Sequence, residues 1–113
     1  MRDVEVKAII RMDRLDTVIR ALRQLPDLPG VTVSHVQGFG RRRTAASDVT
    51  VEYGETLMVK LETVVPAENA ETVVQTIRRT ARTGRPGDGK IFVLAVEQTI
   101  RIRDDDDGSV PIG

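Results

Sequence analysis

Apolar residues at alternating positions predict β-strands in four parts of the chain. The alternation is clearest over 4–11, where charged residues fill most of the intervening positions, and over 56–65, where the intervening positions include Lys60 and Glu62. The β-branched run 31–36 and the apolar run 91–96 are the other two, and 99–103 is predicted as a short fifth strand. In the strand over 4–11, one face is formed by Val4, Val6, Ala8 and Ile10. In the strand over 56–65, one face is formed by Leu57, Val59, Leu61 and Thr63.

Two other segments repeat apolar residues at helical spacing. The first helix is predicted to begin at Asp13 or Asp16 and to end before Pro26. The second is predicted to begin at Pro66 and to end near Gly84, a residue that suits a helix C-cap. Their apolar stripes are Leu15, Val18, Ile19, Leu22 and Leu25 in the first helix, and Ala70, Val73, Val74, Ile77 and Ala81 in the second.

A long polar segment, 41–55, has no clean period and separates the second strand from the third. The order β-α-β, long loop, β-α-β predicts an α+β fold of the ferredoxin-like split βαβ type. In that fold an antiparallel sheet carries both helices on one face. The other sheet face mixes polar and apolar residues, which favours its burial in an oligomer. We expect one domain over 1–103 and a loose acidic tail over 104–113.

Composition mainly excludes classes of function. The 113 residues include 17 Lys and Arg and 17 Asp and Glu, so no net charge attracts nucleic acid or an acidic membrane. The lack of cysteine excludes thiol catalysis and thiolate metal sites, and a single histidine excludes most histidine metal sites. No stretch resembles a membrane span or a signal peptide, so we expect a cytoplasmic protein without membrane insertion.

The segment 83–90, Thr-Gly-Arg-Pro-Gly-Asp-Gly-Lys, is the strongest candidate for ligand chemistry. Its glycines permit a close backbone approach, successive N–H groups can form an anion-binding nest, and Lys90 follows directly. The spacing from Gly84 to Lys90 matches a Walker A loop. However, Ile91 replaces the hydroxyl that holds Mg²⁺, and the order is helix–loop–strand. We therefore reject a P-loop NTPase and retain two alternatives, a phosphate-binding loop or an ordinary turn.

Three further features bear on phosphate binding. Arg101 and Arg103 share a face if the segment 101–103 is extended, and they can then clamp a phosphate. The alternative is that they lie on an edge strand exposed to solvent. Gly38-Phe39-Gly40 is either a second phosphate-facing turn or a strand end. Glu62 is solvated or ion-paired, or else it pairs with Lys90 or Mg²⁺ beside a nucleotide. No nucleophile–base or carboxylate pair is evident, so we predict no catalytic residue and no dedicated metal site.

The residues quoted above resemble those of the PII signal-transduction proteins, small trimeric regulators that bind ATP and ADP. The likeness covers almost the whole chain and is most specific over 83–93. It implies the split βαβ fold and a homotrimer. The other matching segments are Ala8-Ile9-Ile10-Arg11, Val36-Gln37-Gly38-Phe39-Gly40-Arg41, the run from Val59 to Pro66, and Arg101-Ile102-Arg103.

The resemblance also implies a site between subunits for ATP, ADP or AMP, with Mg²⁺ as an optional companion. The segment 41–55 would be an effector loop that contacts a membrane transporter or a metabolic enzyme, with Arg42, Arg43 and Tyr53 as partner contacts. The nucleotide site would comprise Gly87, Asp88, Gly89, Lys90, Arg101 and Arg103 around the phosphates, Gly38, Phe39, Gly40 and Arg41 at the loop's base, and Ile9, Thr32, Glu62, Thr63 and Val64 near the adenosine or Lys90.

Two departures from the family pattern concern regulation. Tyr53 lies close to the third strand and outside a Tyr-Arg-Gly-Ala-Glu-Tyr motif, which argues against its uridylylation. Arg42 and Met58 stand where members that sense 2-oxoglutarate have glutamine and lysine. We therefore expect a regulator that controls its partner according to adenine-nucleotide state, without 2-oxoglutarate sensing or uridylylation.

Two other classes of protein share the predicted element order. RNA-recognition domains need aromatic residues on the open sheet, whereas this chain has only Phe39, Tyr53 and Phe92, so we expect no nucleic-acid partner. The alternative function is a slow ATP-hydrolysing or other phosphate-ester enzyme on the same fold. It would need a base and a Mg²⁺-holding hydroxyl that the sequence does not indicate, so we expect a binding protein and no enzyme.

Overall fold

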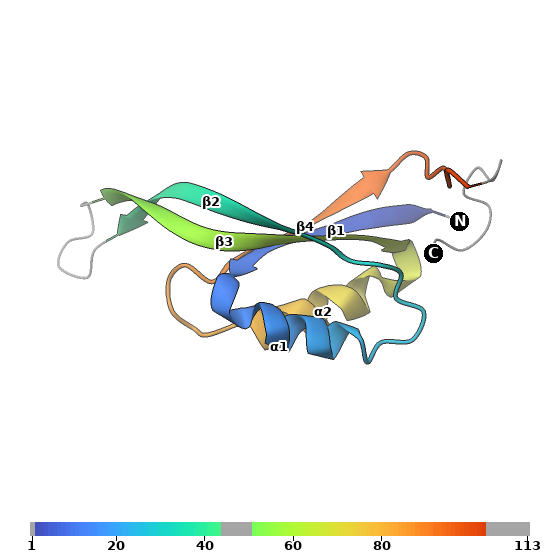
Figure 1. Cartoon of the computed structure of the whole chain (residues 1–113), viewed down its shortest axis with the longest axis horizontal. Coiled ribbons are helices and arrows are strands. Elements are labelled where there is room, and N and C mark those ends of the chain that lie inside the picture. The colour runs from blue at the N-terminus through green and yellow to red at the C-terminus, as the bar shows by residue number, and fades with distance from the viewer. Residues whose placement is uncertain (1, 44–50, 104–113) are drawn as a thin grey trace.

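The computed structural model confirms the predicted split βαβ fold (Figure 1). It describes residues 2–43 and 51–103; at 40–43 and 51–56 it describes the strands but not the side chains. A short 3-10 turn precedes each α-helix. The strands and helices are β1 (Asp3–Arg11), α1 (Leu15–Leu22), β2 (Thr32–Arg43), β3 (Val51–Pro66), α2 (Ala70–Ala81) and β4 (Gly89–Val96).

The four strands form one antiparallel sheet in the order β2-β3-β1-β4, and both helices lie against one face of it (Figure 1). In this register Ala8 of β1 lies between Leu61 of β3 and Ile91 of β4. Within the described part of the chain, neither helix is long and apolar enough to cross a membrane. The sheet's other face carries no helix, as the sequence predicted.

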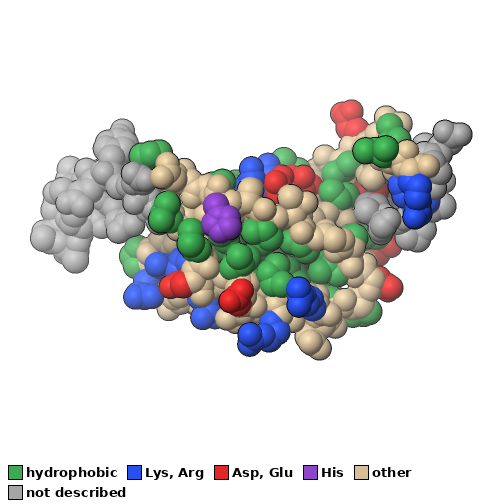
Figure 2. Space-filling view, viewed as in Figure 1, with side chains coloured by type: hydrophobic (Ala, Val, Ile, Leu, Met, Phe, Trp, Pro, Cys, Tyr) green, Lys and Arg blue, Asp and Glu red, His purple; other side chains and the backbone are tan. Residues whose placement is uncertain are grey.

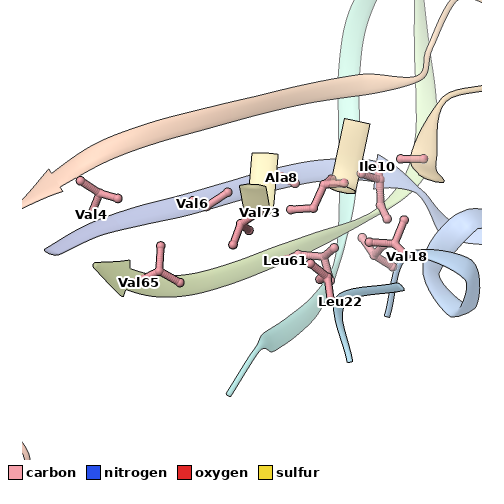
Figure 3. Packing of buried hydrophobic residues seen from close by; sticks show 12 residues of the cluster. Val4, Val6, Ala8, Ile10, Val18, Leu22, Leu61, Val65 and Val73 are labelled. Atoms are coloured by element: carbon pink, nitrogen blue, oxygen red, sulfur yellow. The ribbon is translucent and has the colours of Figure 1, made fainter. Parts of the chain in front are cut away.

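The hydrophobic core lies between the sheet and the helices (Figure 3). Both predicted helical stripes face it, because a helix on a sheet buries residues three and four positions apart. Leu57 departs from the predicted core face and is 58% exposed. The reason is its position on β3, beyond the pairing of Met58 with the last residue of β1. The buried core is Val4, Val6, Ala8, Ile10, Val18, Leu22, Val59, Leu61, Val65, Val73, Ile77 and Ala81.

The first helix differs in length from the prediction. It ends at Leu22 instead of reaching Pro26, and Leu25 packs on the core from a turn in which its N–H donates to the Leu22 carbonyl at 3.0 Å. Asp13 lies in the preceding 3-10 turn and Asp16 in the first α-helical turn, and neither side chain caps the helix. Aspartates in a first turn still favour the positive end of the helix dipole.

Strands β2 and β3 extend into the predicted long loop. β2 continues to Arg43 and β3 begins at Val51, and these two residues pair. The extension is a two-stranded ribbon that projects beyond the helices (Figure 1). A ribbon outside the core needs no apolar face, so periodicity does not reveal it. The rest of the loop, 44–50, and the acidic tail, 104–113, lie outside the described residues.

Hydrophobic side chains also reach the surface between β2 and α1, below the single histidine (Figure 2). They line an apolar hollow of about 530 Å³, to which Ile19, Leu25 and Val31 contribute. Val33 of β2 is 38% exposed beside it. Single exposed apolar residues are common on folded proteins, so we assign no ligand to this hollow.

The predicted fifth strand, 99–103, is wrong. After β4 the described chain forms no further strand, and residues 102 and 103 lie in a turn. The hydroxyl of Thr99 donates to Asp3 at 3.2 Å, which holds the segment beside the start of β1 and outside the ladder. Ile102 is fully exposed. Arg101 and Arg103 therefore do not share a strand face.

Gly89, at the start of β4, is fixed by a close backbone approach. Its φ is +99°, and a Cβ atom there would lie 1.7 Å from the carbonyl oxygen of Ile9 on β1. Such a distance is far inside van der Waals contact, so any side chain would displace β4 from β1. Gly84 also has a positive φ, of +85°, but nothing lies within 4 Å of the place that a Cβ atom would take there. Gly30 has neither constraint.

These three glycines give a graded test of the β1–β4 junction. Gly89→Ala is expected to lower the free energy of unfolding by about 3 kcal/mol or more, because steric overlap adds to the strained φ. Gly84→Ala should cost about 1–2 kcal/mol from φ alone, and Gly30→Ala should stay within about 0.5 kcal/mol. Urea unfolding of the three variants measures this order. Equal effects of Gly89→Ala and Gly84→Ala would contradict the close approach.

Candidate functional site

The glycine-rich loop between α2 and β4 has a defined conformation. Gly84, Gly87 and Gly89 all have positive φ, which is why glycine is needed at these positions. The loop's start is fixed by Arg14, whose Nε and Nη2 donate to the carbonyl of Thr80 at 3.1 and 2.6 Å. This contact satisfies a carbonyl in the last turn of α2 and joins that turn to the start of α1.

Asp88 is the centre of the loop's hydrogen bonds. Its Oδ2 accepts from the backbone N–H groups of Thr83 and Gly84, both at 2.9 Å. Its Oδ1 accepts from the Thr83 hydroxyl and, at 2.9 Å, from Nε of Arg11. The predicted phosphate-binding residue therefore directs its carboxylate to donors of its own loop and of β1. We infer that it shapes the loop and that other groups would meet a phosphate.

Arg11 connects the loop to the central strand β1, and the sequence did not single it out as a site residue. Besides its ion pair with Asp88, its Nη2 donates to the carbonyl of Pro86 at 2.6 Å. The same guanidinium lies against Gly87, where a Cβ atom would be 3.4 Å from Nη2. The sequence offered one signal, a cation at the end of the strand that lies beside the loop.

The hydrogen bonds of Asp88 hold its pKa well below the usual range of an aspartate. The Thr83 hydroxyl is the largest cause, followed by Arg11, and the backbone N–H groups of Thr83 and Gly84 add to it. Donors to a carboxylate favour its charged form. Asp88 is consequently ionised throughout the neutral range, and the loop's donors are engaged by a fixed negative charge.

Lys90 lies on the helix-free face of the sheet. The register places it opposite Ile9 of β1, and Ile9 in turn opposite Lys60 of β3. Of the alternatives for Glu62, a contact with Lys90 does not occur within the chain, because β1 separates their strands. Glu62 instead forms an ion pair with Lys60 at 3.8 Å, two residues away on the same face.

The residues predicted near the adenosine do not all face one way. Thr32 lies opposite Glu62 on the helix-free face, and the alternation of β3 places Val64 on that face too. Thr63 points to the helix side, where it is buried and donates to the carbonyl of Gly30 at 3.1 Å. Phe39 of β2 is 72% exposed. The side chains of Arg41, Arg42, Arg43 and Tyr53, and the surroundings of Gly40, lie outside what the structure describes, although all five residues are in strands.

Arg101 and Arg103 are far from the glycine-rich loop of the same chain. The loop enters β4 at Gly89, whereas both arginines follow its last residue, Val96 (Figure 1). The eight residues of this strand span about 25 Å. One chain alone therefore does not bring the two arginines and Lys90 together around one phosphate.

Comparison with known proteins identifies the family. The family model described as "Nitrogen regulatory protein P-II" matches residues 4–106. The chain belongs to the P-II family of nitrogen regulatory proteins. It is 42% identical to the P-II protein of Rhizobium meliloti over 109 residues, which cover 92% of this chain and 95% of the relative. It is also 42% identical to P-II 1 of Escherichia coli K12 over 111 residues, covering 94% and 98%.

Solved structures of P-II proteins have the same fold. Arabidopsis thaliana PII bound to citrate is 40% identical, with a TM-score of 0.76, covering 96% of this chain and 90% of the other. The complex of B. subtilis GlnK with ATP is 29% identical, with a TM-score of 0.80, covering 94% and 92%. Membership of the P-II family makes this chain a regulatory protein and not an enzyme, as the sequence predicted.

The titration of Asp88 tests how the loop of this P-II protein is held. The pKa of Asp88 is lower in the folded state than in the unfolded state. The carboxylate therefore contributes its full stabilisation above the unfolded-state pKa, and this stabilisation is lost as the pH falls through the folded-state pKa. Thr83→Val is expected to raise the pKa of Asp88 toward its ordinary value, and Arg11→Gln should raise it less. The Asp88 carboxyl carbon shift, followed by NMR into strong acid, measures both.

The exposed Thr17 of α1 provides the matched control for that titration, since Thr17→Val changes the same side chain outside the loop. It should leave the pKa of Asp88 unchanged. In Thr83→Val, the hydrogen exchange of the amides at positions 83 and 84 should also quicken, by about tenfold. An unchanged Asp88 titration in Thr83→Val would show that the hydroxyl does not hold the carboxylate.

Proposed function

We propose that this protein is an adenine-nucleotide-binding regulator whose nucleotide site is shared between two chains of a homotrimer. The observation that carries the proposal is the separation of the phosphate-binding candidates by the length of β4. Lys90 lies at one end of the strand, and Arg101 and Arg103 lie beyond the other. Two cations from a second copy would supply the charge that one chain does not bring to the loop.

The loop has the properties of a preformed phosphate site. Its backbone is fixed by three glycines of positive φ and by the Asp88 carboxylate, so binding would cost little reorganisation. Lys90 has no hydrogen bond or ion pair with the side chains that the structure describes, so it is available to an anion. One relative of known structure, B. subtilis GlnK, was solved in complex with ATP, which supports an adenine nucleotide as the ligand.

Exposed apolar residues on β4 support the assembly of several copies. Phe92, Val93 and Leu94 are each more than 40% exposed on this edge strand, and Ile100 and Ile102 follow it. An exposed, apolar edge strand is a hazard unless another surface covers it. The trimer is the assembly that the resemblance to PII proteins implies.

The segment 41–55 is proposed as the effector loop, at the end of the β2–β3 ribbon. In the proposal, ATP, ADP and AMP differ in their contacts at its base, Gly38 to Arg41, and thereby bias the loop between states. A membrane transporter or a metabolic enzyme in the cytoplasm would respond to that difference. Arg42 and Met58 argue against 2-oxoglutarate as a second effector, and the place of Tyr53 argues against uridylylation.

A calorimetric titration panel tests the nucleotide proposal. ATP, ADP and AMP, each with and without Mg²⁺ or 2-oxoglutarate, are expected to give saturable binding whose affinity 2-oxoglutarate does not change. Lys90→Ala should weaken ATP binding by about tenfold or more, because it removes a charge-assisted hydrogen bond. Arg79→Ala on α2 is the control. No heat with any nucleotide at millimolar concentration would contradict nucleotide binding, and a tenfold tightening by 2-oxoglutarate would contradict our interpretation of Arg42 and Met58.

Mixed oligomers test whether the site is shared between chains. Lys90→Ala and Arg103→Ala homo-oligomers should each bind ATP weakly. When the two variants are unfolded and refolded together in equal amounts, about a quarter of the sites should regain both cations by random assembly. Tight binding at that stoichiometry is the expected result. If refolded mixtures bind no better than either variant, Lys90 and Arg103 do not act across a subunit boundary.

A further inference from the structure

A pocket of about 410 Å³ lies between the C-terminal half of α2 and the start of β4. It is distinct from the hollow beside β2. Its deepest residues are apolar and almost fully buried, and its rim carries two arginines. The floor includes Ile10, Ile77 and Ala81, and the arginines are Arg78 and Arg82.

The pocket lies on the helix side of the sheet, opposite most of the residues proposed near the adenosine, although Asp88, Gly89 and Lys90 of the proposed phosphate site also line it. Ile77 and Ala81 come from α2, which covers the helix face, and Ile10 points to the same side in the core. Ile9, Lys60 and Glu62 occupy the helix-free face. The start of β4 borders both the pocket and the helix-free face. The sheet itself therefore lies between a ligand in the pocket and the helix-free face.

The charges of the rim are not balanced. Asp88 is the one acidic residue that lines the pocket, and its carboxylate is already engaged by Arg11 and by Thr83. Arg78 and Arg82 make no hydrogen bond or ion pair within the part of the chain whose side chains are described. A guanidinium matches a carboxylate or a phosphate in geometry and charge.

We propose that this pocket is a second ligand site, for a small organic anion with an apolar body. Its carboxylate or phosphate would bind Arg78 and Arg82, and its apolar part would cover Ile77 and the neighbouring floor. Ligand sites typically combine an apolar lining with a few convergent polar groups, as this one does. A bare inorganic anion would leave the apolar floor unused, and a neutral apolar ligand would leave the guanidiniums unused.

Phenyl phosphate and benzoate are suitable probes because they carry the two candidate anionic groups on the same apolar ring. Each is titrated calorimetrically into the full-length protein that has been saturated with ATP, so that the proposed nucleotide site is occupied. We expect binding of at least one probe, tighter than that of inorganic phosphate, and none of phenol. The stronger probe identifies the preferred anionic group. Binding of inorganic phosphate as tight as that of both probes would contradict a role for the apolar floor.

Variants of neighbouring arginines provide the matched comparison. Arg82→Gln should weaken the stronger probe by about tenfold, the loss of one charge-assisted hydrogen bond, and leave ATP affinity unchanged. Arg79→Gln changes an adjacent arginine that does not line the pocket and should have no effect. Val74→Phe should block the probe by filling the pocket. Equal losses in Arg79→Gln and Arg82→Gln would indicate general attraction by α2 and overturn the site.

Methyl NMR locates the probe and separates this proposal from the nucleotide one. Signals of Ile77 and Ile91, which line the pocket, should move on adding the probe, while that of Ile19 beside the other hollow should not. If ATP fails to bind but these methyls still respond, the pocket stands without the nucleotide proposal. If ATP binds and displaces the probe, or if neither probe moves these methyls, the second site is refuted.

Discussion

The contact of Arg11 with the glycine-rich loop joins the central strand to the region where α2 turns into β4. One guanidinium binds the carboxylate of Asp88 through Nε and the carbonyl of Pro86 through Nη2. Asp88 in turn binds the backbone at Thr83 and Gly84. The loop therefore has one conformation because each end of it contacts the same carboxylate, and that carboxylate is fixed to β1.

This arrangement depends on the two faces of β1. Val6, Ala8 and Ile10 are buried against the helices and place β1 in the middle of the sheet. The alternate residues then necessarily face the other side, where Ile9 separates Lys60 from Lys90. Packing of one face thus determines the row of cations on the other, and the close approach of Gly89 to Ile9 sets how near β4 comes.

The sequence predicted those features that follow from local periodicity. Alternation identified β1 and the core part of β3, and helical spacing identified both stripes, because burial on one face imposes a regular pattern. It did not predict the ribbon formed by β2 and β3 beyond Gly40, because solvent-exposed pairing leaves no apolar period. The alternation of Arg101 and Arg103 suggested a strand that the structure lacks. A strand forms only where a neighbouring strand pairs with it, and alternating residues in one segment do not show that such a neighbour exists.

The candidate site was predictable in composition more than in geometry. The glycines and Lys90 of the loop were identified from spacing, but one partner of Asp88, Arg11, is 77 residues away in the chain, and no local pattern indicates such a contact. Likewise the sequence left open whether Glu62 is ion-paired elsewhere or contacts Lys90, and the strand order decides it by placing β1 between their strands. Which residues meet across a sheet is set by strand order, which a sequence motif does not encode.

The rigidity of the loop constrains how a bound nucleotide could act in the proposed function. A ligand shifts an equilibrium only through a difference in its interactions with the two states. The loop 83–88 is held by hydrogen bonds that are satisfied within the chain, so it offers the same groups in either state. The loop can therefore contribute to the affinity for a nucleotide, but it contributes little to a difference in affinity between the two states. In the proposed function, the contacts that distinguish one nucleotide from another would lie outside the helix-covered core, where the β2–β3 ribbon extends (Figure 1).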